Sequence, residues 1–161
     1  MLIPKLLWPL LIYEVSSSTV ETIEGKINKF TRKWLEVPPG LSDVALYCAN
    51  AKLTLPFKSV LEEYKAGKAR LTMMLCESKD AVVRAVQPTI KTGRKWKVNE
   101  AVSTGPWWSK ASIRERRDLV VQEIREPENS KRFQKAVQQR QQGQWTTWEG
   151  ALQGSLTWND F

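Results

Sequence analysis

Four cations surround one indole within seven consecutive residues, and no other stretch of the chain offers a clearer binding chemistry. The cations are Lys91, Arg94, Lys95 and Lys97. Lysine and arginine neutralise phosphates, and the ring of Trp96 could stack on an unpaired base, so the composition is typical of nucleic-acid backbone binding. The alternative interpretation is a solvated basic turn in which Trp96 is buried as an anchor of the core.

A second basic group lies further along the chain, on the outward side of a predicted helix. It consists of Arg114, Arg116 and Arg117. We expect Arg114 and Arg117 to add contacts to phosphates, because clustered arginines provide the electrostatic attraction on which such binding depends. The alternative is an ordinary exposed helix face.

The residues on which most enzymes and metal sites depend are missing. Histidine is absent, so the chain lacks the usual general acid or base near neutral pH and the commonest metal ligand. Cys48 and Cys76 do not have the spacing of a zinc or redox motif, and we expect both to be buried thiols of a reduced, intracellular protein. The sequence therefore predicts no metal and no cofactor.

Carboxylates with a catalytic spacing are absent as well. Polymerases hold two magnesium ions between close aspartates, and this sequence contains no Asp-Asp pair. The acidic doublet Glu62-Glu63 falls at the start of a predicted helix, where it complements the helix dipole. We expect no catalytic residue and no enzymatic activity of these residues in isolation.

Helices must position these groups, because apolar residues recur at spacings of three and four and strict alternation stays short. Capping boxes of the Ser-x-x-Glu type begin at Ser18, Ser59 and Ser112. Pro127 is expected to end one helix before the next begins. Helices are predicted to start at or near Ser18, Ser42, Ser59, Ser78, Thr92, Ser112 and Glu128.

Two of the predicted helices have a clear inward face. The first carries an apolar stripe formed by Val20, Ile23, Ile27, Phe30 and Trp34. The inward face of the third consists of Leu61, Tyr64, Lys68, Leu71 and Leu75. Lys65 is expected on an outer face. The chain should therefore be an all-α fold of about six or seven amphipathic helices in an irregular bundle, with a less ordered C-terminal tail.

Positive charge is concentrated in the second half of the chain. Residues 1–80 carry 11 basic and 9 acidic side chains, whereas residues 81–161 carry 14 and 8. We therefore expect a helical domain over residues 1–88 and a basic, Trp-rich helical region over 89–161. The net charge of +8 favours an anionic partner.

The start of the chain is apolar from Leu6 to Tyr13, directly after Lys5. This stretch is far shorter than the ~20 residues of a membrane-spanning helix, and we expect no membrane partner. A secretory signal is an alternative, although the stretch contains a proline and no clean cleavage site follows. We favour an apolar segment that packs against the rest of the protein or against chain upstream of it.

Several short strings, in order along the chain, resemble one protein family. They are Trp8–Val15, Arg32–Leu35, Ala45–Tyr47, Leu53–Pro56, Glu62–Lys65, Thr92–Lys97 and Arg140–Gly143. Together they resemble the segment that follows the catalytic palm in reverse transcriptases of non-LTR, LINE-type retrotransposons. The similarity extends from about Leu7 to Trp158.

In that family this region is a helical thumb and a linker that hold the template–primer duplex. The resemblance implies binding of RNA, DNA or an RNA–DNA hybrid, a role that would fall to Lys91, Arg94, Lys95 and Lys97. The paired aspartates of the palm and a Cys/His knuckle are not present, so we expect a non-catalytic fragment that works with the rest of a reverse transcriptase. The alternative is a helical protein-interaction scaffold without a nucleic-acid role, with an exposed apolar patch near residues 6–13 or at Trp107-Trp108.

Overall fold

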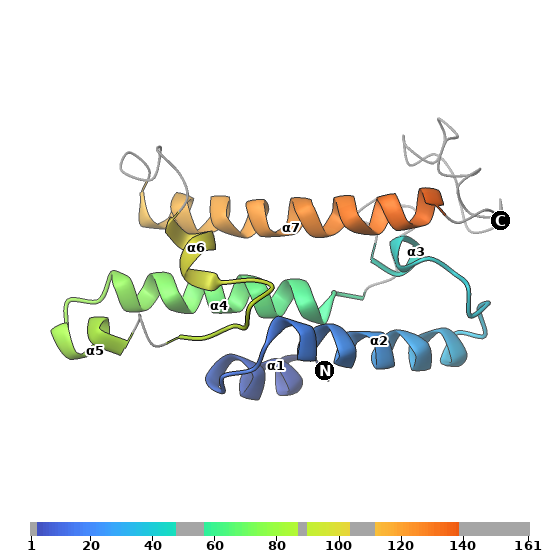
Figure 1. The fold of residues 1–161 in the computed structure, drawn as a ribbon, viewed down its shortest axis with the longest axis horizontal. Helices are drawn as coiled ribbons and strands as arrows, with labels where there is room; N and C mark the ends of the chain where they lie inside the picture. The colour runs from blue at the N-terminus through green and yellow to red at the C-terminus, as the bar shows by residue number, and fades with distance from the viewer. Residues whose placement is uncertain (1–2, 48–56, 87–89, 104–111, 139–161) are drawn as a thin grey trace. The chain divides into compact units, whose positions relative to one another are not determined.

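The computed structural model describes residues 3–47, 57–86, 90–103 and 112–138, and every regular element in these ranges is a helix (Figure 1). The helices are α1 (Ile3–Ile12), α2 (Ser17–Trp34), α3 (Asp43–Tyr47), α4 (Val60–Cys76), α5 (Ala81–Val86), α6 (Val98–Ser103) and α7 (Ile113–Gln138). Over the described ranges, the predicted all-α fold is therefore confirmed. The expected C-terminal tail, Cys48 and Trp107-Trp108 lie outside these ranges.

The chain divides into two compact units, and α2 and α7 each contribute residues to both. The first unit comprises residues 1–24 and 60–125, and the second comprises residues 25–59 and 126–161. Each unit thus joins segments that are far apart in the sequence. The domain boundary expected between residues 88 and 89 rests on the distribution of charge and stays a prediction.

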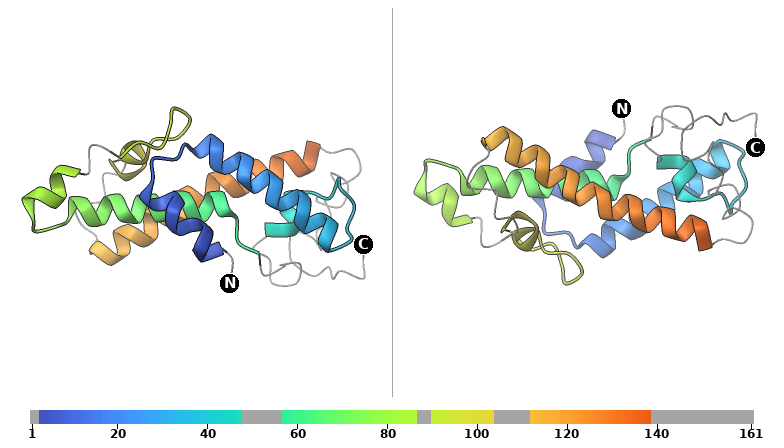
Figure 2. Two further views of the ribbon diagram at one scale, coloured as in Figure 1. Left: turned by 90° about the horizontal axis from the view of Figure 1, so that it is seen from below. Right: turned by 90° about the horizontal axis from the view of Figure 1, so that it is seen from above.

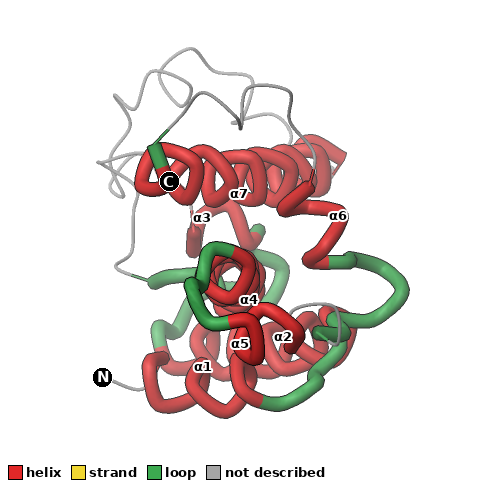
Figure 3. The backbone as a smooth tube through the Cα atoms, turned by 90° about the vertical axis from the view of Figure 1, so that its left-hand side faces the viewer, coloured by secondary structure: helices red, strands yellow, loops and turns green. Residues whose placement is uncertain are grey.

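Helix α4 is central to the first unit, where it contacts α1, α5 and α6 (Figures 1 and 2). Figure 3 looks along α4 and shows α1 and α6 on different sides of it. Side chains from α4, α6 and the first half of α7 form the core of this unit. They are Ala69, Met73, Val98, Val120 and Ile124. Burial of such side chains stabilises a fold by roughly 1.5–3 kcal/mol each for the larger ones.

Two lysines of α4 are buried. Lys68, which the sequence places on the inward face, is 2% exposed and donates to the carbonyl oxygens of Leu11 at 2.7 Å and Tyr13 at 3.0 Å. This ammonium group complements the dipole at the end of α1. The expected outer position of Lys65 is wrong: its side chain is buried, and its Nζ lies 5.6 Å from the ring centroid of Trp96. That partner comes from a distant segment, so local periodicity could not reveal it.

The N-cap of α2 is Ser16, and the predicted cap at Ser18 is wrong. The Ser16 hydroxyl accepts a hydrogen bond from the N–H of Thr19 at 3.2 Å. Glu21, the expected acidic partner of Ser18, instead forms an ion pair with Lys95 at 2.7 Å. A tertiary ion pair therefore takes the carboxylate that the local capping motif would have used.

Helix α7 begins with the predicted capping box and continues further than predicted. The N–H of Ser112 donates to Glu115 Oε2 at 2.8 Å, and the N–H of Glu115 donates to Ser112 Oγ at 3.3 Å. The expected break at Pro127 is wrong, because α7 runs through this residue to Gln138. Proline removes one backbone hydrogen bond, but cooperative helix propagation on both sides maintains the rest of the helix.

The end of α4 and the whole of α5 lie outside the core of the first unit. Cys76, which the sequence predicts to be buried, is exposed. The buried residues of α4 extend only to Met73, so the turn that carries Cys76 reaches past the core. Helix α5 has no buried residue, and Val82 is 76% exposed.

In the second unit, the face of α2 that contacts α3 is polar. Asn28 is buried there, and Arg32 is partly buried. Phe30 and Trp34 are 69% and 79% exposed, so the predicted apolar stripe of α2 does not stay buried along its whole length. Leu46 of α3, by contrast, is 1% exposed, which agrees with the short helix predicted from Ser42.

Candidate nucleic-acid interface

The basic segment of residues 91–97 is a folded loop that Thr92 closes. The Thr92 hydroxyl donates to the carbonyl oxygen of Trp96 at 2.8 Å and accepts from the N–H of Val98 at 3.1 Å. The predicted helix that starts at Thr92 and contains Trp96 is wrong, because α6 starts only at Val98, and the Thr92 hydroxyl instead accepts from the first N–H of that helix across the loop. The hydrogen bonds made by Thr92 close the backbone around Arg94, Lys95 and Lys97, and Lys91 directly precedes Thr92.

The loop is also attached to the start of α2. The N–H of Ser17 donates to the carbonyl oxygen of Thr92 at 3.0 Å. Gly93 has a φ of 95°, a conformation that favours glycine, and a Cβ atom at this position would lie 3.0 Å from the Cβ of Ser16. Only glycine combines this backbone conformation with such a close approach.

Trp96 anchors the loop to α4. Its ring centroid lies 6.4 Å from that of Tyr64 at an interplanar angle of 59°, and Lys65 lies over its ring. The indole is partly buried and packs against the core of the first unit. Because Lys65 already occupies a face of the ring, the contacts of Trp96 fit the alternative of a core anchor.

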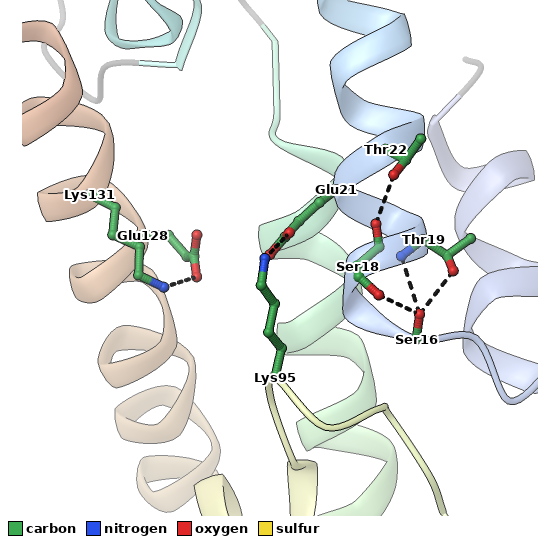
Figure 4. Close-up of polar contacts among 8 residues, drawn as sticks. All are labelled: Ser16, Ser18, Thr19, Glu21, Thr22, Lys95, Glu128 and Lys131. Carbon is green, nitrogen blue, oxygen red and sulfur yellow. Dashed lines mark hydrogen bonds and ion pairs between the residues drawn. The ribbon is translucent and has the colours of Figure 1, made fainter.

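The four cations of the loop are exposed, but they differ in their partners. Lys95 forms an ion pair with Glu21 at 2.7 Å (Figure 4), and Lys97 forms one with Glu100 at 2.7 Å. The hydrogen bond to Glu100 raises the pKa of Lys97. Lys91 and Arg94 have no carboxylate partner among the described residues.

The arginines at the start of α7 also differ from one another. Arg116 and Arg117 both pair with Glu77, at 3.3 Å and 3.1 Å, whereas Arg114 is exposed. Glu77 follows the last residue of α4. The ion pairs with Glu77 thus hold Arg116 and Arg117 at the end of α4, whereas the loop of residues 91–97 contacts α2 and the middle of α4.

A polar network in the second unit includes functional groups that sequence reasoning misses. Arg32 Nη2 bonds to Asp43 Oδ1, which also accepts from Asn28 Nδ2 at 3.1 Å. The Tyr47 hydroxyl donates to Asn28 Oδ1, and the guanidinium carbon of Arg132 lies 5.2 Å from the ring centroid of Tyr47. We call these five residues the Arg32–Arg132 network. In the sequence, this network is indicated only by two polar residues, Asn28 and Arg32, which lie one turn apart on α2.

Helix α1 and the residue that follows it present exposed apolar side chains. Trp8, Ile12 and Tyr13 are 70%, 57% and 68% exposed. Trp8 and Ile12 are four residues apart and therefore share one face of the helix. The opposite side packs on α4, where Leu10 is buried. The segment thus packs against the protein as expected and leaves an apolar face uncovered by the described residues.

The described residues contain no group of three or more Cys, Asp or Glu that could hold a metal ion. No helix in the described ranges is long and apolar enough to cross a membrane. Comparison with protein-family models, with curated proteins and with solved structures finds no match to this chain.

Proposed function

We propose that this protein binds the backbone of RNA or of an RNA–DNA hybrid through the loop of residues 91–97. The observation that carries the proposal is the pair of exposed cations Lys91 and Arg94, which lie beside Thr92 and Gly93 on a fixed backbone. Arginine and lysine in such a position release counterions when they contact phosphates. A preformed loop also loses little conformational freedom when it binds.

Lys95 and Lys97 would contribute less than their neighbours. Each already has a carboxylate partner, Glu21 or Glu100, and would have to exchange it for a phosphate. Both ion pairs are exposed to solvent and therefore weak, so this exchange is feasible. Trp96 would act by positioning the loop, and Arg114 would extend the basic surface at the start of α7.

The resemblance to the post-palm region of LINE-type reverse transcriptases supports the same role. In such enzymes a thumb and linker hold the template–primer duplex, while the palm carries the polymerase chemistry. We accordingly propose binding, without catalysis, for the residues of this chain.

The test is the salt dependence of binding, measured by fluorescence anisotropy with a labelled RNA hairpin and a matched RNA–DNA hybrid. For Arg94→Gln we expect the slope of log K against log salt to decrease by about one, because one phosphate contact is lost. Lys79→Gln is the matched control, since Lys79 is an exposed cation of the same unit outside the loop. Binding that is undetectable at low salt, or slopes that are equal for the two variants, would contradict the proposal.

The second candidate is a helical protein-interaction scaffold. The exposed apolar face of α1, with Trp8 at 70% and Ile12 at 57% exposed, is the observation that favours it. This function would depend on apolar contact and not on phosphate. The two candidates therefore differ in their sensitivity to nuclease and to salt.

A further inference from the structure

The second unit contains an open pocket of about 150 Å³ in which cations outnumber carboxylates among the charged lining residues. Arg32, Arg132 and Lys135 line it together with one carboxylate, Asp43. The turn at residues 39–41 forms a further part of its wall. A cavity of this volume can accommodate a molecule the size of benzene, so it has room for one small anion and not for a whole nucleotide.

The charge of the lining favours a dianion. Three cations and one carboxylate give a net charge of +2 around the pocket. A phosphate monoester carries roughly −1.5 to −2 at neutral pH, whereas a phosphodiester in a nucleic-acid backbone carries about −1. Charge complementarity thus points to a terminal or free phosphate and not to a phosphate within a strand.

The two arginines of the pocket are held in place before any ligand arrives. The Arg32–Arg132 network connects them through Asp43, Asn28 and Tyr47. Arg32 Nε also donates to the carbonyl oxygen of the turn at residue 41, at 2.8 Å. Asn28, in the middle of the network, is 5% exposed. Because the network fixes the guanidinium groups, binding an anion requires little ordering of side chains.

We propose that this pocket binds a phosphate group that is free or terminal. The guanidinium groups of Arg32 and Arg132 would supply planar donors for its oxygens, and the ammonium group of Lys135 would supply a point charge at the exposed rim. Asp43 would orient Arg32 and would not contact the ligand. The site is separate from the loop of residues 91–97 and does not depend on the function proposed for that loop.

The experiment is a titration of the full chain with inorganic phosphate, followed by isothermal calorimetry at constant ionic strength. Lys135→Gln should weaken binding about tenfold, the order of effect that the loss of one charge-assisted hydrogen bond produces. Lys131→Gln is the matched control, since Lys131 lies one turn away on α7, is 64% exposed and pairs with Glu128. The affinity of Lys131→Gln for phosphate should equal that of the unmodified protein.

Arg132→Gln is the second variant and should also weaken binding, with circular dichroism to verify that the helices are retained. Absence of phosphate binding at matched ionic strength, or equal affinities for Lys135→Gln and Lys131→Gln, would overturn the proposal. Arg94→Gln changes neither the pocket nor its lining, so this variant should bind inorganic phosphate as the unmodified protein does even if it loses RNA binding. Failure of one proposal therefore does not imply failure of the other.

The source of the phosphate is distinguished with two oligonucleotides that differ only in a 5′-phosphate or a 5′-hydroxyl. A preference for the phosphorylated strand that disappears in Lys135→Gln would support a terminal phosphate of nucleic acid. Equal binding of both strands, together with phosphate binding that Lys135→Gln weakens, would support free phosphate.

Discussion

Tyr64 shows how one buried side chain can connect several segments of the first unit. Its hydroxyl donates to the carbonyl oxygen of Val15, its ring packs against Trp96, and the Nζ of Lys68 lies 5.9 Å from the ring centroid. The side chain is 0% exposed. Burial disfavours the charged phenolate and raises the pKa of Tyr64 to about 12.

The raised pKa of Tyr64 makes the stability of the protein depend on pH. The ordinary pKa of tyrosine is 10.0, so the stabilising contribution of the neutral phenol is complete below pH 10 and is lost as the pH rises toward 12. Between these values, the free energy of unfolding should fall by roughly 2–3 kcal/mol more for the unmodified protein than for Tyr64→Phe. Urea denaturation at a series of pH values measures this difference.

Tyr13→Phe is the control for that experiment, because the Tyr13 side chain is 68% exposed. Its stability should follow the same pH dependence as the unmodified protein. If Tyr64→Phe follows that curve as well, the buried hydroxyl of Tyr64 does not cause the loss of stability between pH 10 and pH 12.

The end of α2 is a strained turn that the sequence does not reveal. The N–H of Val37 donates to the carbonyl oxygen of Arg32 at 3.1 Å, and the N–H of Glu36 donates to that of Lys33 at 3.3 Å. These bonds form a Schellman motif in which Glu36 has a φ of 56°. Helix α2 ends at Trp34, and the turn that follows places Glu36, a residue whose side chain disfavours this conformation, at the positive φ.

Glu36→Gly should therefore stabilise the protein by about 1 kcal/mol, because glycine adopts a positive φ without steric cost. The substitution also removes a negative charge from the C-terminal end of a helix. Thermal unfolding should show a higher midpoint for Glu36→Gly than for Glu36→Gln, which removes the charge but keeps the strain. The reverse order of the two midpoints would be evidence against the strained turn.

The elements that sequence reasoning predicted well are those that depend on local interactions. The capping box of Ser112 and Glu115 forms as predicted because both partners lie within one turn. The predicted cap at Ser18 does not form, because α2 starts at Ser17 with Ser16 as its cap, and Glu21 pairs instead with Lys95, a residue far along the chain. In the same way, Lys65 is buried by a tertiary partner.

The two candidate binding sites also differ in whether local sequence or tertiary contacts create them. The loop of residues 91–97 could be proposed from composition, since clustered cations are visible in the sequence. The pocket of the second unit could not, because Arg32 and Arg132 are a hundred positions apart and meet only through folding. Even within the loop, the sequence does not reveal which cations are paired with carboxylates, because the partner of Lys95 is the distant residue Glu21.

The exposed apolar face of α1 and the net charge of +8 of the chain predict different partners. Apolar surface favours association with protein, and positive charge favours association with nucleic acid. Each can be tested without disturbing the other, because Trp8 and Arg94 lie on different elements.

If α1 mediates protein association, the chain should self-associate, and Trp8→Gln should shift it toward the 18.5 kDa monomer. Sedimentation equilibrium after nuclease treatment measures the effect without a contribution from bound nucleic acid. Val82→Gln is the control, since Val82 is 76% exposed on α5. A protein that is monomeric at all concentrations, or one that responds equally to both variants, would exclude association of copies through α1.

In the basic loop, the residues that determine the backbone conformation are different from the residues that carry the positive charge. Thr92, Gly93 and Trp96 each have a specific hydrogen bond, backbone conformation or packing contact, so few substitutions would preserve the loop. The exposed cations have no such restriction. Over evolutionary time, the threonine, the glycine and the tryptophan should therefore change slowly, while lysines and arginines could move among neighbouring positions without altering the fold.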